Sequence, residues 1–148
     1  MARLFTYGTL MLAEVMEIVA GRRFAARRAE LPGYRRRLLR DAVYPGLVPA
    51  AGETVEGVLW EGLDPHALAR IDRFEGALYE RPELRVSVAP AESCAAFVYL
   101  LRPEHRALAT DSAWREDDFR ERHLRGYLAA CRASRRSCAT TAQRRDSR

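Results

Sequence analysis

The pattern of apolar and polar positions predicts a chain built mostly from short strands. Alternating or continuous apolar stretches indicate strands at Arg3–Tyr7, Phe24–Leu31, Tyr34–Arg40, Leu47–Ala50, Thr54–Glu61, Arg85–Ala89 and Ala95–Leu101. The last stretch is apolar throughout, which is typical of a central strand buried on both faces. Turns are expected between these strands where glycine and proline cluster, at Pro32-Gly33, Tyr44-Pro45-Gly46 and Ala51-Gly52.

Three other stretches have the spacing of amphipathic helices. The first covers Leu10–Ala20, with Thr9 expected as its N-cap and Gly21 at its end. The second begins after Asp64, which a proline follows at the favoured first position. The third covers Glu116–Cys131. Because strands outnumber helices and the turns are short, we expect an α+β fold, in which two or three helices flank a compact mixed β-sheet or partial barrel.

Length and charge divide the chain into one domain at 1–131 and a tail at 132–148. Six of the 25 arginines but only one of the 20 acidic residues lie in the tail, so the net charge of +5 belongs to it. The tail is polar and aperiodic, which predicts disorder. A domain that binds nucleic acid usually carries a basic face, so the balanced domain argues against such a partner. Recruitment of nucleic acid or an acidic surface by the tail alone is a separate alternative.

Composition excludes several classes of protein. No apolar run reaches the ~20 residues that span a bilayer, and the N-terminus has no secretory signal pattern. We therefore expect a cytoplasmic protein without membrane contact. The three cysteines form no CxxC pair and the three histidines share no metal-ligand spacing, so neither a disulfide framework nor a metal site is predicted. The sequence does not indicate the oligomeric state.

Glu75 is the charged residue whose position is most informative. It follows Ile71 by one helical turn and Leu68 by two, so it shares the inward face of the second helix. Gly76 is expected to end this helix, which places the carboxylate near the negative end of the helix dipole. Burial and the dipole both raise the pKa of a carboxylate, as suits a general base. The alternative is a carboxylate turned to water or paired with a nearby arginine.

A candidate anion site lies where the first strand meets the first helix. The N–H groups of Tyr7, Gly8, Thr9 and Leu10 lie at or near a helix start, a geometry that binds anions. The alternative is that Gly8 serves backbone geometry only. An anion cradle together with a buried carboxylate is the minimum equipment for acid–base chemistry on a small acidic metabolite.

Two further candidates follow Glu75 closely. Tyr79 is placed to hydrogen-bond a bound substrate, and Arg81 is placed to hold a substrate carboxylate. The sequence leaves equal weight to a Tyr79 that belongs to the core and an Arg81 that is a surface charge.

Several short motifs occur in a characteristic order: LFTYGTLM at 4–11, LPGYRR at 31–36, YPGLVP at 44–49, VEGVLWEGL at 55–63, LARIDRFEGALYERPELRVSV at 68–88 and DFRERHL at 118–124. In this order the chain resembles the γ-glutamylcyclotransferase-like superfamily, in particular its avirulence-induced-gene-like branch. The motifs cover nearly all of residues 4–128. The combination of YGTL with FEG-x-x-Y-x-R is the specific part of the resemblance.

The resemblance implies a compact, partly barrel-like fold. It also implies that the backbone at Tyr7, Gly8, Thr9 and Leu10 binds the substrate and that Glu75 is the catalytic acid/base. In the reaction of the family, the free α-amine of a γ-glutamyl group attacks its own γ-carbonyl. The products are 5-oxoproline and a released amine, amino acid or peptide, and no metal or cofactor is expected. The alternative is a non-catalytic module of the same fold that senses a small carboxylate.

Overall fold

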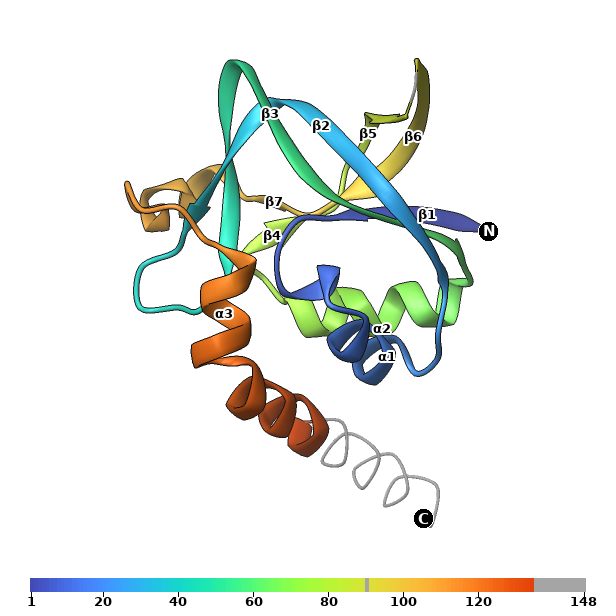
Figure 1. The fold of residues 1–148 in the computed structure, drawn as a ribbon, viewed down its shortest axis with the longest axis vertical. Helices are drawn as coiled ribbons and strands as arrows, with labels where there is room; N and C mark the ends of the chain where they lie inside the picture. The colour runs from blue at the N-terminus through green and yellow to red at the C-terminus, as the bar shows by residue number, and fades with distance from the viewer. Residues whose placement is uncertain (90, 135–148) are drawn as a thin grey trace.

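A closed β-barrel forms the centre of the computed structural model, which describes residues 1–89 and 91–134 (Figure 1). Its five strands follow the order β1 (Ala2–Thr6), β3 (Pro45–Leu63), β2 (Ala25–Leu38), β5 (Glu83–Val88) and β6 (Glu92–Val98). Neighbouring strands are antiparallel except β1 and β6, which are parallel. Two short strands, β4 (Tyr79–Glu80) and β7 (Leu100–Leu101), pair separately. The predicted α+β fold is therefore confirmed.

The helices lie beside the barrel and carry parts of the candidate site (Figure 1). They are η1 (Thr9–Met11), α1 (Ala13–Ala20), α2 (Pro65–Glu75), η2 (Pro103–Leu108), α3 (Glu116–Arg122) and a further helical segment at 124–134. The start of α2 is as predicted, because the Asp64 side chain accepts a hydrogen bond from the Ala67 N–H at 2.8 Å. Gly21 ends α1 with a φ of 94°, a conformation that favours glycine.

Two of the predicted helices differ from the structure. Thr9 does not cap α1: the chain first makes the η1 turn, and Leu12 then precedes α1. The C-terminal helix is broken at His123 and resumes at 124–134, three residues beyond the predicted end at Cys131. The rest of the predicted tail, 135–148, lies outside the described residues.

The two longest strands were predicted as shorter pieces. β2 runs through Gly33, and β3 runs through Gly52, although turns are predicted at both glycines. Both have positive φ, and the β2–β3 register shifts between Pro32 and Tyr34. A β-bulge absorbs the extra residues, and its backbone uses glycine as readily as a turn does. The predicted strand Ala95–Leu101 is also divided, with Tyr99 between β6 and β7.

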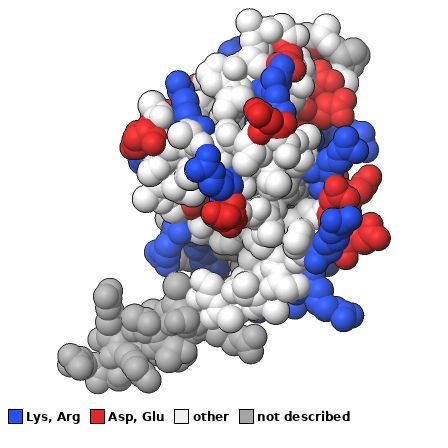
Figure 2. Space-filling view, turned by 90° about the vertical axis from the view of Figure 1, so that its left-hand side faces the viewer, with Lys and Arg blue, Asp and Glu red and all other residues white. Residues whose placement is uncertain are grey.

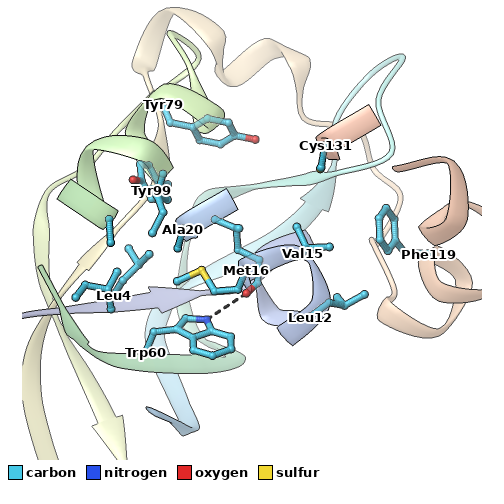
Figure 3. Close-up of a cluster of buried hydrophobic side chains, with 14 of the residues drawn as sticks. Leu4, Leu12, Val15, Met16, Ala20, Trp60, Tyr79, Tyr99, Phe119 and Cys131 are labelled. Carbon is cyan, nitrogen blue, oxygen red and sulfur yellow. Dashed lines mark hydrogen bonds between the residues drawn. The ribbon is translucent and has the colours of Figure 1, made fainter. Parts of the chain in front are cut away.

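Strand β1 separates two parts of the hydrophobic core. Successive side chains of a strand point to opposite faces, so Leu4 packs with the helices while Phe5 packs inside the barrel. On the helix side, Met16 of α1 points toward Leu4 and the indole of Trp60 (Figure 3). Because both faces of β1 are buried, the turn that follows it starts from a fixed position.

Charged side chains on the face in Figure 2 alternate in sign instead of forming one large patch. Several arginines of the described residues pair with carboxylates of other elements. Arg120 of α3 bonds Glu14 of α1 at 3.1 Å, and Arg22 bonds Asp64 at 3.0 Å. Exposed pairs of this kind contribute little to stability, but the first ties α3 to α1. Among the described residues, no helix is long and apolar enough to cross a membrane.

Candidate active site

A cavity of about 250 Å³ opens where the end of β1, the end of α2 and the 124–134 segment meet. Its walls are mainly aromatic and come from segments far apart in the sequence. The lining residues are Phe5, Thr6, Tyr7, Gly8, Thr9, Leu10, Tyr44, Pro45, Phe74, Glu75, Tyr79, Tyr99 and Tyr127. Among the described residues of this lining, Glu75 is the one carboxylate, and no arginine, lysine or histidine accompanies it.

Glu75 is the last residue of α2 and belongs to the cavity wall. The helix ends at Gly76, as predicted, with the Gly76 N–H donating to the Asp72 carbonyl at 3.0 Å. Within the described residues the Glu75 carboxylate has neither a hydrogen-bond partner nor an ion pair. The carboxylate therefore stays available to a bound molecule.

The environment of Glu75 favours its protonated form. Desolvation by the cavity wall raises the pKa of the carboxyl from 4.5 to about 8, and the nearby charge of Asp72 adds to the shift. Burial also raises the pKa values of the hydroxyls of Tyr7, Tyr79 and Tyr127 above that of an ordinary tyrosine. These tyrosines are therefore neutral hydrogen-bonding groups around one titratable acid.

The turn after β1 faces the same cavity. Its backbone bonds run from the Met11 N–H to the Gly8 carbonyl at 2.9 Å and from the Leu12 N–H to the Thr9 carbonyl at 3.2 Å. The N–H groups of Thr9 and Leu10 precede these bonds and so have no partner inside the turn. Both residues line the cavity, which makes their amides candidates for binding an anionic group.

Several side chains hold this turn in place. The Trp60 indole N–H donates to the Thr6 hydroxyl at 3.0 Å and to the Leu10 carbonyl at 3.1 Å; the second bond is drawn in Figure 3. The Tyr7 hydroxyl donates to the carbonyl of Tyr99. Position 8 needs a glycine, because a Cβ there would lie 2.8 Å from the ring of Pro45. The turn is thus fixed before any ligand arrives.

Thr9 is held through its side chain as well. Its hydroxyl lies 3.0 Å from the hydroxyl of Tyr127, which comes from the 124–134 segment. The ring of Tyr127 packs edge-on against Phe74 and Phe119. The C-terminal helical segment thereby forms one wall of the cavity.

Of the predicted site residues, the cavity brings together Tyr7, Gly8, Thr9, Leu10, Glu75 and Tyr79. Tyr79 is buried, and its hydroxyl donates to the Pro45 carbonyl at 2.9 Å. Arg81 does not line the cavity. Its guanidinium binds both carboxylate oxygens of Asp72, at 2.7 and 3.1 Å.

Sequence reasoning missed three tyrosines of the cavity, Tyr44, Tyr99 and Tyr127. Tyr99 lies inside an apolar run that predicts a plain strand, although its hydroxyl donates to Asp72 at 2.6 Å. Tyr127 lies on the apolar face of a predicted helix, where an aromatic residue indicates packing. Neither position carries a pattern that distinguishes a cavity wall from a core.

Residues 4–119 match the family model described as gamma-glutamyl cyclotransferase, AIG2-like. The chain belongs to this family. AIG2-like protein D of Arabidopsis thaliana is 26% identical over 132 residues, which cover 86% of this chain and 85% of that protein. AIG2-like protein C of the same plant is 32% identical over 83 residues, which cover 56% of this chain and 48% of that protein.

Solved structures agree with the fold. A solution structure of an Arabidopsis thaliana protein superposes with a TM-score of 0.67 at 23% identity and covers 87% of each chain. A structure titled gamma-glutamyl cyclotransferase superposes with a TM-score of 0.63 at 17% identity, covering 89% of this chain and 86% of that one. An AIG2-like protein of Mus musculus has a TM-score of 0.58 at 27% identity, with 78% of this chain and 88% of that chain covered.

Proposed function

We propose that this chain closes γ-glutamyl compounds to 5-oxoproline and releases the amine, amino acid or peptide attached to the γ-carbonyl. One observation carries the proposal. A carboxylate with a raised pKa, Glu75, which has no partner among the described residues, shares a small cavity with the fixed turn of the YGTL motif, in a chain of the cyclotransferase family. Both halves of the expected chemistry are therefore present in one place.

In this proposal the turn binds the negative charge of the substrate. The amides of Gly8, Thr9 and Leu10 hold either the α-carboxylate or the oxyanion that develops on the γ-carbonyl during attack. The fixed geometry of the turn lowers the cost of arranging these donors during the reaction. None of the described residues that line the cavity is cationic, so the backbone supplies the complement to that charge.

Glu75 transfers the proton. Its carboxylate takes one proton from the substrate α-ammonium, and the freed nitrogen forms a bond to the γ-carbon. When the tetrahedral intermediate collapses, the bond between the γ-carbon and the leaving nitrogen breaks. The protonated Glu75 gives its proton to that nitrogen as it leaves. Glu75, again a carboxylate, then takes the second surplus proton from the nitrogen of the new ring and passes it to the released amine, which departs as an ammonium, so the enzyme returns to its starting state. Protons and bonds balance without any other reactant.

The raised pKa makes this transfer feasible. A glutamate of ordinary pKa is about four units weaker as a base than an α-amine near 8, a mismatch of roughly 5 kcal/mol. With the pKa of Glu75 at about 8, the two groups compete for the proton on nearly equal terms. Nucleophile and electrophile also belong to one molecule, so a cavity that folds the substrate supplies much of the remaining rate.

The test is turnover of a panel of γ-glutamyl amines, amino acids and peptides, with 5-oxoproline as the measured product. The wild-type chain is expected to convert at least one compound, and Glu75→Gln is expected to bind it with little or no turnover. A folded Glu75→Gln variant that works at the wild-type rate contradicts the mechanism. Binding of 5-oxoproline without turnover of any compound would instead identify the non-catalytic sensing module.

A further inference from the structure

We propose that Arg36 is a positioning residue, which orients the substrate-binding turn from outside the cavity through the peptide unit between Tyr7 and Gly8. The inference rests on the proposed function and adds a residue to it. Arg36 ends the LPGYRR motif, to which the mechanism above assigns no role. Its Nη1 donates to the Tyr7 carbonyl at 2.8 Å.

The direction of this bond matters because the Tyr7–Gly8 peptide is trans. A trans peptide unit points its C=O and its N–H to opposite sides. Arg36 lines a second cavity, of about 680 Å³, whereas Tyr7 and Gly8 line the cavity that contains Glu75. The two cavities have no described lining residue in common. The Tyr7 carbonyl is therefore drawn toward the outer side, and the Gly8 N–H is turned toward the substrate.

The guanidinium of Arg36 is itself well fixed. It lies over the ring of Trp114, 5.4 Å from the ring centroid, and makes a second, longer bond to the Glu56 carbonyl at 3.4 Å. Trp114 is buried, and its indole N–H donates to the Val43 carbonyl at 2.8 Å. A charged donor held in this way fixes the plane of the peptide that it bonds.

The bond also strengthens the opposite end of the peptide unit. A hydrogen bond from a charged donor is stronger than one between neutral groups, and successive hydrogen bonds polarise one another. Withdrawal of electron density from the Tyr7 carbonyl makes the Gly8 N–H a better donor. Arg36 thus contributes to anion binding without touching the substrate.

The sequence allows a direct observation of this peptide unit. Tyr7-Gly8 is the single Tyr–Gly step in the chain, so a sample with ¹³C-carbonyl tyrosine and ¹⁵N-glycine gives one carbonyl-edited amide signal. The variant Arg36→Met keeps the aliphatic stem and removes the donor, and it is expected to shift that signal. The control is Arg35→Met on the same strand, where the exposed guanidinium pairs with Glu53 and no shift is expected.

Kinetics with the best substrate of the panel complete the test. Arg36→Met is expected to lower kcat/KM by about tenfold or more, less than the loss of a direct oxyanion donor. Arg36→Lys, which keeps the charge, is expected to recover part of the loss, and Arg35→Met is expected to stay within twofold of wild type. A fall in kcat indicates that the amide serves the oxyanion, and a rise in KM indicates that it serves the carboxylate.

Two results overturn the inference: a Gly8 signal that Arg36→Met leaves in place, or a shifted signal with kcat/KM still within twofold of wild type. Thermal unfolding of each variant identifies a loss of activity that comes only from misfolding. If the wild-type chain converts no γ-glutamyl compound, the proposed function fails by itself. The Gly8 signal needs no substrate, so it still decides whether Arg36 orients this peptide unit.

Discussion

Replacing Glu75 by glutamine is expected to stabilise the folded chain at neutral and alkaline pH. Glutamine has the shape of a protonated glutamate but carries no charge. The pKa of Glu75 is raised to about 8 by desolvation and by Asp72, so the folded state holds this proton more tightly than the unfolded chain does. The stability gained from the proton is complete below pH 4.5 and is lost as the pH rises through about 8.

The magnitude follows from the two pKa values. Each pH unit between the ordinary value of 4.5 and about 8 costs about 1.4 kcal/mol of unfolding free energy. The buried charge of Glu75 therefore costs up to about 3 kcal/mol at pH 7 and up to about 5 kcal/mol above pH 8. These are upper values, because Glu75 is only half-buried and water screens its charge.

The assay is urea unfolding of the wild type and of Glu75→Gln at several pH values between 4.5 and 9, followed by circular dichroism. The stability difference in favour of the variant is expected to be small at pH 4.5 and to grow steadily toward pH 8. The matched control is Glu80→Gln, which makes the same substitution at a position exposed to water. A Glu75→Gln difference that is flat across this range, or that decreases with pH, would contradict a raised pKa of Glu75 in the folded state.

Three other substitutions test parts of the same site. Gly8→Ala is expected to lower stability by about 1–3 kcal/mol in urea unfolding and to reduce turnover, because the new Cβ would lie 2.8 Å from the Pro45 ring. Unchanged turnover would contradict the need for this turn geometry. Asp72→Asn is expected to shift the pH midpoint of kcat/KM downward, since the charge of Asp72 helps to raise the pKa of Glu75; an upward shift would reverse the assigned sign. Trp60→Phe removes the indole donor that bonds two oxygens of the turn, and it is expected to cost about 1–3 kcal/mol of stability; a loss below a few tenths of a kcal/mol would show that the bonds are dispensable.

Local signals in the sequence were sufficient to predict where α2 begins and where it ends. Asp64 followed by proline marks the start of the helix, and Gly76 marks its end, both by backbone chemistry that depends on a few neighbouring residues. Because Glu75 shares the helix face of the buried Ile71, its place at the cavity followed from spacing. These features need no knowledge of distant contacts.

Other features depend on contacts that no local pattern records. Gly33 and Gly52 have the positive φ that a turn or a bulge requires, and only the long β2–β3 pairing decides in favour of the bulge. Thr9 has the side chain of a helix cap, yet its hydroxyl forms a hydrogen bond with Tyr127, which lies far from it in the sequence. Arg81 finds Asp72 nine positions earlier, across the end of α2, instead of lining the cavity.

The most direct test of the account is the titration of the Glu75 side chain itself. In protein labelled with ¹³C at the glutamate carboxyls, the signal that is absent from Glu75→Gln belongs to this residue, and its chemical shift is followed from pH 3 to pH 10. The expected midpoint lies near 8, as burial beside Asp72 requires. A midpoint near the ordinary 4.5 would mean a well-solvated carboxylate, poorly matched to the substrate amine, and would contradict the proposed acid–base role.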